Sequence, residues 1–186
     1  MKLLLMGSAI RGLPVVSIAE GEDVAEVRDI IYHAEAGTVV GFTLNKRGML
    51  AGRHKHVLPI EQVHAIGRDA VMIDDQHQLM APKQAAEAVA SPETERNVIG
   101  NDVLTEAGVS LGQVKDVVVL AGAGGDVVGY QIELPSRGVG YIPLPAQLAV
   151  SGTALVVPSA TAEFVVNDLV GLGAAVDDFR ERLGIQ

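Results

Sequence analysis

The amino-acid sequence predicts a mainly β protein that contains two copies of one small unit and ends in a helix. Residues 26–44 read EVRDIIYHAEAGTVVGFTL, and residues 113–134 read QVKDVVVLAGAGGDVVGYQIEL. Each stretch has Val, a basic residue and Asp, then an apolar run, a Gly-bearing turn and Val-Val-Gly-aromatic, which is typical of a β-hairpin. Aromatic residues make up only 3% of the chain, so aliphatic side chains must fill the core, and their β-branched members favour strands.

The elements of the first unit follow from apolar runs separated by polar or Gly-bearing turns. We expect a strand at residues 13–18, a hairpin at 24–44 and a second hairpin turn marked by Gly48 and Gly52. A Pro-bearing apolar run at 57–60 suits a sheet edge or a strand end. One helical turn at 61–66 and a strand at 70–74 close the unit.

A linker separates the two units. Residues 78–96 break the β pattern with Pro82, Pro92 and an Ala/Gln/Glu-rich middle. The second unit then repeats the order, with strands at 97–105 and 139–145 and at 153–157 around the central hairpin. We therefore predict unit 1 at 1–77, a linker at 78–96, unit 2 at 97–160 and an amphipathic helix at 161–186.

The period of the apolar residues changes in the C-terminal tail. Its apolar side chains are spaced alternately by four and three residues, which predicts one apolar stripe on a helix. The stripe consists of Val165, Leu169, Leu172, Val176, Phe179 and Leu183. The same spacing suits a coiled-coil seam, although Gly171 and Gly173 weaken the helix. The helix can pack on its own or a neighbouring unit, or it can mediate a dimer.

Composition and charge limit the classes of function. The chain has no Cys, which excludes disulfides, thiolate metal sites and Cys nucleophiles. The apolar run at residues 3–6 is too short for a signal peptide, and no run approaches the about 18 apolar residues of a membrane span. We therefore expect a cytoplasmic protein. The net charge of −9 makes direct DNA binding unexpected, because affinity for phosphate needs clustered cations.

The repeated motifs resemble the PRC-barrel family. In the second unit they are Leu111-Gly112-Gln113-Val114-Lys115-Asp116, Val128-Gly129-Tyr130 and Ile142-Pro143-Leu144; in the first they are Gly12-Leu13-Pro14-Val15-Val16, Val27-x-Asp29, Val39-Val40-Gly41-Phe42 and Leu58-Pro59-Ile60. The family includes the cytoplasmic part of the photosynthetic reaction centre H subunit and the C-terminal domain of a ribosome maturation factor. The resemblance covers residues 5–75 and 97–158.

This resemblance implies two tandem PRC-type β-barrels of about six strands each, and contacts with other proteins rather than catalysis. The chain departs from both relatives, since it has neither the membrane helix of the first nor the separate N-terminal domain of the second. The first unit also has Val24-Ala25-Glu26 where the family shows a Leu-Gly pair before its Val. Neither specific function can be transferred.

One concentrated cationic stretch is the best pointer to a binding surface. It consists of Lys46, Arg47, Arg53, His54, Lys55 and His56. The matching part of the second unit, residues 135–140, has only Arg137. The difference suggests a surface for an acidic protein or for phosphate groups. A solvated hairpin is the alternative.

A metal site is a weaker hypothesis for the same hairpin. His54 and His56 are two residues apart and would project to one face of a strand. With a third ligand from His33, His64 or His77 they could hold a metal such as zinc. Nothing in the spacing selects that ligand, and we predict no cofactor and no metal.

Other candidate motifs have structural explanations. Gly122-Ala123-Gly124-Gly125 and the stretch from Gly7 to Gly12 resemble nucleotide loops, but neither is followed by the required helix, so we expect turn or strand glycines. Asp29 and Asp116 recur at one place in both units, which indicates a capping or turn role rather than a catalytic pair.

No catalytic constellation stands out. The expected function is therefore that of a non-enzymatic interaction or scaffold module that binds a still unidentified protein and self-associates. The alternatives are an RNA-processing or ribosome-assembly accessory, and a small-ligand or metal-responsive sensor.

Overall fold

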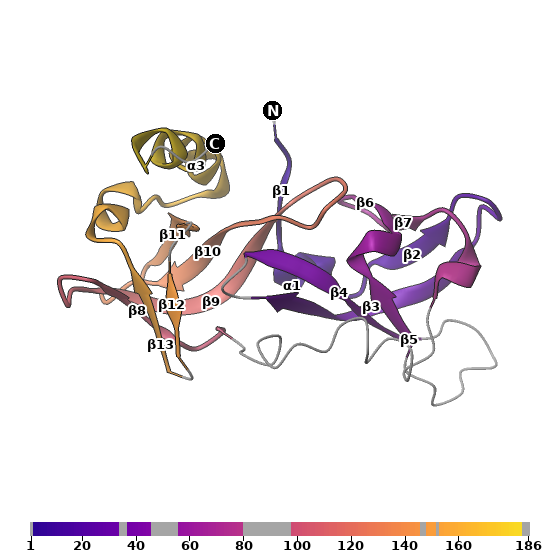
Figure 1. Ribbon diagram of the computed structural model, residues 1–186, viewed down its shortest axis with the longest axis horizontal. Helices are drawn as coiled ribbons and strands as arrows, with labels where there is room; N and C mark the ends of the chain where they lie inside the picture. Colours follow the sequence, from indigo (N-terminus) through magenta and orange to yellow (C-terminus); the bar gives the residue numbers. More distant parts are fainter. Residues whose placement is uncertain are drawn as a thin grey trace.

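The structure, a computed structural model, describes residues 2–33, 37–45, 56–79, 98–145, 148–151 and 153–183. It is mainly β, with two sheets and a C-terminal helix (Figure 1), so the predicted fold class is confirmed. Most of the predicted linker, residues 80–96, and most of the cationic hairpin lie outside the described residues. The domain boundaries at 77 and 97 therefore stay predictions.

The first sheet contains the two repeat strands predicted from the motif at residues 26–44. Its strands are β2 (Pro14–Ser17), β3 (Asp23–His33), β4 (Thr38–Asn45), β5 (His56–Pro59), β6 (Val63–Ile66) and β7 (Val71–Ile73). They lie in the order β5-β4-β3-β2-β7-β6. β2 and β7 pair in parallel, and every other pair in this sheet is antiparallel.

The second sheet repeats this order strand by strand. Its strands are β8 (Asp102–Thr105), β9 (Ser110–Leu120), β10 (Val127–Glu133), β11 (Val139–Pro143), β12 (Ala149–Val150) and β13 (Ala154–Val157). They lie in the order β11-β10-β9-β8-β13-β12. Here too one pair is parallel, that of β8 with β13. The topology therefore duplicates that of the first sheet, as the repeat in the sequence predicts.

The repeat extends to the backbone of one turn in each half. Gly12 and Gly100 have φ angles of 84° and 92°, values that glycine adopts without the penalty other residues incur. The N–H of Gly12 donates to the carbonyl of Val27 at 2.8 Å, and the N–H of Gly100 donates to that of Val114 at 2.8 Å. In both halves this hydrogen bond joins the turn to the long central strand of the sheet, which contains Val27 in the first half and Val114 in the second.

The turn between β9 and β10 joins the two sheets. Gly122 and Ile66 exchange two backbone hydrogen bonds of 2.9 Å, and the N–H of Val39 donates to the carbonyl of Gly125 at 2.8 Å. A Cβ on Gly125 would lie 2.9 Å from the Cβ of Val39. The glycines of this stretch are turn glycines, as predicted. Because glycine has no side chain, the backbone of this turn comes close enough to hydrogen-bond with the backbone of the first sheet.

The first residues of the chain cross to the second sheet. β1 (Leu4–Met6) pairs antiparallel with β9, and the four-residue helix α1 (Gly7–Ile10) packs against β9 next to it. A Cβ on Gly7 would lie 2.6 Å from Val117, so close packing explains this glycine. Its prediction as a turn or strand glycine was wrong, because it begins α1.

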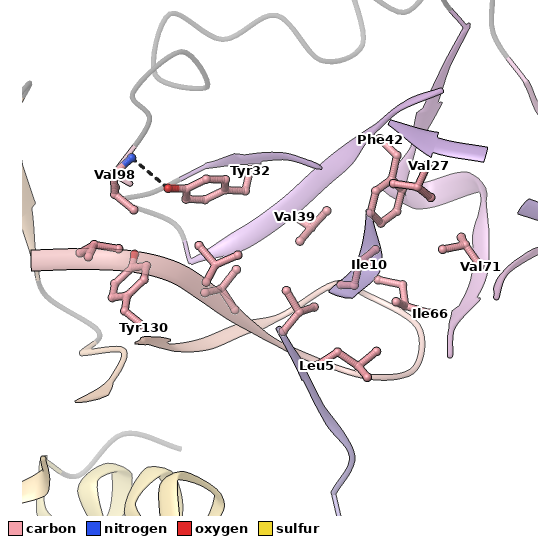
Figure 2. Close-up of a cluster of buried hydrophobic side chains, with 14 of the residues drawn as sticks. Leu5, Ile10, Val27, Tyr32, Val39, Phe42, Ile66, Val71, Val98 and Tyr130 are labelled. Carbon is pink, nitrogen blue, oxygen red and sulfur yellow. Dashed lines mark hydrogen bonds between the residues drawn. The ribbon is translucent and has the colours of Figure 1, made fainter. Parts of the chain in front are cut away.

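Both sheets share one hydrophobic core. Leu5 and Ile10 lie in it together with Phe42 of the first sheet and Tyr130 of the second (Figure 2). The core is almost entirely aliphatic, as the low aromatic content predicts. Because the core is continuous, the two sheets form one body.

The predicted helical turn at 61–66 was partly wrong. The 3-10 turn η1 covers Ile60–Gln62, and β6 begins at Val63. Val63 pairs with Ile73 of β7, and this tertiary pairing overrides the local preference. A second 3-10 turn, η2 (Gln76–Gln78), follows β7.

The C-terminal helix α3 (Leu169–Leu183) lies over the outer face of the second sheet (Figure 1). Leu172 and Val176 pack on Val118 and Val128. Phe179 meets Phe164 of the 3-10 segment η3 (Ser159–Phe164) edge to face at 5.0 Å between ring centroids. The central part of the predicted stripe therefore packs on its own chain and is buried there.

Candidate functional site

A groove runs between the N-terminal segment and the helix α3. Its volume is about 480 Å³. Its lining residues are Lys2, Leu3, Leu4, Leu169, Val170, Gly173, Ala174 and Asp177. The two walls are far apart in the sequence and come together because β1 pairs with β9 while α3 packs on the same sheet.

The alternating direction of side chains along β1 explains which residue lines the groove on the strand side. Leu5 points into the main core, whereas Leu4 and Met6 belong to the cluster beneath α3. Successive side chains of a strand point to opposite faces, so one wall of the groove is Leu4. On the helix wall, a Cβ on Gly173 would have Leu4 Cδ1, at 3.9 Å, as its nearest neighbour. The small residues Gly173 and Ala174 therefore leave space where larger side chains would fill it.

The rim of the groove exposes large apolar side chains. Val170 is 80% exposed and Leu3 is 43% exposed. Val170 lies on the helix face opposite the buried Leu172 and Val176, so packing on its own sheet does not explain it. An apolar groove with an apolar rim is a candidate site for binding a partner.

An ion pair crosses the groove. Lys2 Nζ donates to Asp177 Oδ1 at 2.6 Å. This hydrogen bond lowers the pKa of Asp177, and the positive charges of Lys2 and Arg180 act in the same direction. Both side chains are exposed, so the pair adds little to stability. It places one charge of each sign beside the apolar lining.

A second, polar depression lies on the second sheet. Its volume is about 310 Å³. It is lined by Asp102, Ser110, Gly112, Gln113, Glu133, Leu134, Pro135 and Arg137. Lys115 Nζ, near it, lies 2.8 Å from Glu133 Oε2. The depression combines the carboxylates of Asp102 and Glu133 with the guanidinium of Arg137 and the hydroxyl of Ser110.

Two tyrosines are buried where the sheets meet. Burial raises the pKa of Tyr32 to about 12, and its hydroxyl accepts a hydrogen bond of 3.0 Å from the N–H of Val98 (Figure 2). Burial also raises the pKa of Tyr130, whose hydroxyl has no partner among the described atoms. Burial disfavours the charged form of both phenols, so they stay protonated at neutral pH.

The repeated carboxylates do not meet in one site. Both oxygens of Asp116 accept from the N–H of Ser8, at 3.0 and 3.2 Å, and one accepts from Val117. Asp29 accepts from the N–H of Ile30 at 2.9 Å and lies 3.0 Å from Arg11 Nε. The contacts of Asp116 with the start of α1 agree with the predicted capping role. Asp29 lies inside β3 rather than at a strand end or turn, so the prediction was wrong for Asp29.

The predicted cationic hairpin falls mainly outside the described residues. Those residues are Lys46, Arg47, Arg53, His54 and Lys55. His56 is described and begins β5, where it is half-buried. His64, a candidate third ligand, lies 2.9 Å from Asp74. In the part of the chain that the structure describes, no three His or carboxylate side chains are placed to hold a metal ion. The hairpin therefore stays a prediction.

Sequence reasoning missed the groove. A faint signal was present, because Val170, Gly173, Ala174 and Asp177 follow helical spacing on the side opposite the apolar stripe. Only the pairing of β1 with β9 brings Leu3 and Leu4 to that face. This pairing spans more than a hundred residues and leaves no local pattern.

Comparisons with known proteins identify one domain. A search of curated proteins found no match to the chain. No helix in the described ranges is long and apolar enough to cross a membrane. A family model, the PRC-barrel domain, matches residues 6–79. The match covers the first unit and does not extend to the second, whose membership of the family stays a prediction. The chain therefore contains a PRC-barrel domain at residues 6–79.

Proposed function

We propose that this protein is a non-enzymatic interaction module, and that the groove between β1 and α3 receives an apolar segment of a protein partner. The proposal rests on the exposure of the Val170 side chain. It is 80% exposed at the edge of a groove of about 480 Å³. A PRC-barrel domain fits a small interaction module.

Burial of the groove supplies a driving force for binding. Removing apolar surface from water contributes roughly 25 cal/mol per Å². Val170 and Leu3 form the exposed rim, and Gly173 with Ala174 leaves a hollow into which an apolar side chain fits. An apolar centre with charges at its edge is the usual anatomy of a protein interface.

The groove can bind a partner with little rearrangement, because both of its walls are fixed on the second sheet. β1 is held on β9 by pairing from Leu4 to Met6, and α3 is anchored by Leu172 and Val176. Both walls therefore rest on the same sheet. A preformed site keeps the entropy cost of binding low.

The contacts of the polar side chains support a non-enzymatic role. Asp29 and Asp116 are engaged with backbone N–H groups, and Tyr32 accepts from Val98. These groups serve the fold, and in the groove the acid Asp177 and the base Lys2 are exposed and paired with each other.

Site-specific photo-cross-linking in the native cells tests the proposal. A photoreactive residue at Val170 should give a discrete adduct that survives ribonuclease. The same residue at Ile18, which is 49% exposed on the turn after β2, should not. Gly173→Leu fills the groove and should abolish the Val170 adduct. If Val170 gives no adduct, or if ribonuclease removes the adduct, the proposal is wrong, and the second result would point to RNA.

A further inference from the structure

We infer that the outer face of the first sheet is a second binding surface, which receives an acidic amphipathic helix of a partner protein together with one extended residue before that helix. The surface consists of Ile31 on β3, Val40 and Gly41 on β4, and Val57 on the edge strand β5. It lies apart from the groove between β1 and α3 and therefore goes beyond the proposed function. The second sheet shows what such a face binds.

The strand register gives each of these residues a counterpart in the second sheet. Both sheets contain a glycine paired with a proline, Gly41 with Pro59 in the first and Gly129 with Pro143 in the second. This shared pair fixes the correspondence of the neighbouring residues. The counterparts are Val118 for Ile31, Val128 for Val40, Gly129 for Gly41 and Tyr141 for Val57.

In the second sheet, this face is covered by the chain that follows the last strand. At the sheet edge, Val166 exchanges two backbone hydrogen bonds with Tyr141, of 2.8 and 3.0 Å. Leu172 of α3 then lies over Gly129, where a Cβ atom would be 3.2 Å from both of its methyl carbons. One extended residue and one helix thus cover the face.

No described segment covers the corresponding face of the first sheet. The atoms nearest to a Cβ on Gly41, at 2.7, 3.2 and 3.4 Å, all belong to the backbone of the neighbouring strand β5 and not to a helix. Ile31, Val40 and Val57 are half-buried and belong to neither hydrophobic cluster of the described residues. The two valines beneath α3 are buried. The first sheet therefore presents an apolar face of the kind that α3 covers in the second.

The edge strand β5 offers backbone groups to the extended residue of the partner. In an antiparallel pair, residues whose N–H and C=O bond to the opposite strand alternate with residues whose groups point away from it. The bonds of Tyr141 to Val166 point away from β10, so the groups of its counterpart Val57 point away from β4. Among the described residues, none bonds to these outward groups of Val57. Such edge groups pair readily with an added extended segment.

The sequence after β7 does not repeat the covering segment. Counted from the ends of β13 and β7, the position of Val166 is taken by Pro82 and that of Leu172 by Ala88. Proline has no N–H to donate, and alanine is too short to reach over Gly41 as leucine does over its counterpart. The helix α3 of a second copy is already engaged on its own sheet. The matching segment therefore has to come from a different protein.

The charge beside this face favours an acidic partner. In the sequence, β5 directly follows Arg53, His54 and Lys55 of the cationic stretch. Charges attract across about 8 Å at physiological salt, so this attraction needs no fixed contact. The segment that covers the second sheet is itself acidic, because residues 163–183 carry five acidic and two basic side chains. An acidic helix with a leucine-sized residue is thus the chemistry that fits.

Hydrogen exchange of the full chain tests whether the edge is free. The N–H of Tyr141 donates to Val166 and should exchange at least about a hundredfold more slowly than the N–H of Val57. Equal protection of Val57 in the purified protein would show that the chain covers its own edge, and would overturn the inference.

A peptide copying residues 163–183 is the probe for the partner's chemistry. The resident α3 is tethered at an effective concentration of about millimolar, so a peptide at micromolar concentration goes to the first sheet. It should shift the amide resonances of Ile31, Val40 and Val57. The peptide with Val166→Pro should bind about threefold to tenfold more weakly, since it lacks one hydrogen bond. The peptide with Leu172→Ala should bind at least about tenfold more weakly.

Variants of the protein locate the peptide on this face. Val40→Asp should abolish peptide binding, because the peptide would bury an unpaired charge. Val156→Asp, a matched change at an exposed residue of β13, should leave binding unchanged. Circular dichroism melting identifies a misfolded variant, and the two altered peptides then decide. No binding, binding that Val40→Asp does not weaken, or shifts confined to the second sheet would each overturn the inference. The Val170 adduct should survive Val40→Asp, so the inference and the proposed function fail separately.

Discussion

Tyr130 of β10 occupies in the second sheet the position that Phe42 of β4 occupies in the first. Tyr130 pairs with Ile142 beside the pair Gly129–Pro143, and Phe42 pairs with Leu58 beside Gly41–Pro59. Both rings are fully buried. They differ by one hydroxyl, and that hydroxyl has no hydrogen-bond partner among the described atoms.

Tyr130→Phe should therefore stabilise the protein. A buried polar group without a partner costs about 1–3 kcal/mol, and the repeat shows that a Phe ring suits this position. We expect the free energy of unfolding, measured by urea denaturation, to rise by roughly 1 kcal/mol. Phe42→Tyr is the matched control and should destabilise. A clear loss of stability in Tyr130→Phe would mean that the hydroxyl is hydrogen-bonded, for example to a buried water.

Tyr32 should make stability depend on pH in the alkaline range. Its pKa is raised to about 12 from 10.0. The folded state therefore holds the proton more tightly than the unfolded state. The stability that the raised pKa of Tyr32 provides is fully present below pH 10 and is lost as the pH rises from 10 to 12. It amounts to about 2–3 kcal/mol. Urea denaturation across this range should show a steeper loss for the wild type than for Tyr32→Phe; equal slopes would contradict the assignment.

Gly125→Ala should weaken the joint between the two sheets. Gly125 has a φ of 63°, and a Cβ there would lie 2.9 Å from the Cβ of Val39. Gly108 has a similar φ of 76° but open space around it. Gly108→Ala should therefore cost about 1 kcal/mol from backbone strain alone. Gly125→Ala should cost at least about 2 kcal/mol, because overpacking adds to the strain. Equal losses in thermal unfolding would show that the joint tolerates the methyl group.

The two repeated carboxylates should differ in their contribution to stability. Asp116 is 9% exposed and accepts from the N–H of Ser8 through both oxygens. The side chain of Asp29 is 54% exposed beside Arg11. We expect Asp116→Asn to lower the free energy of unfolding by about 1–2 kcal/mol, and Asp29→Asn by less than about 0.5 kcal/mol. Chemical denaturation of both variants gives the comparison, and a larger effect at Asp29 would refute it.

The sequence allowed the repeat to be predicted because strand pairing follows local patterns. The motif Val-x-Asp followed by Val-Val-Gly-aromatic occurs on β3–β4 and again on β9–β10, with Gly12 and Gly100 placed alike. These features depend on residues close together in the chain. The two copies share this pattern of motifs, and their sheets have the same strand order.

Long-range pairing explains what the sequence did not show. β1 has only three residues, and it becomes a strand because β9 accepts it. Val63 begins a strand rather than continuing a helical turn because Ile73 pairs with it. The groove depends on both β1 and α3, so no single stretch of sequence could indicate it. The cationic hairpin, by contrast, was predicted from a local run of charge, and the described residues leave that prediction untested.

The pairing of β1 with β9 also affects how the protein matures during synthesis. Leu4, Leu5 and Met6 are synthesised more than a hundred residues before their partners Leu120, Val119 and Val118. Until then β1 lacks the strand it pairs with, and unpaired strand edges favour aggregation in nascent chains. β1 therefore takes its final place only after β9 has been made.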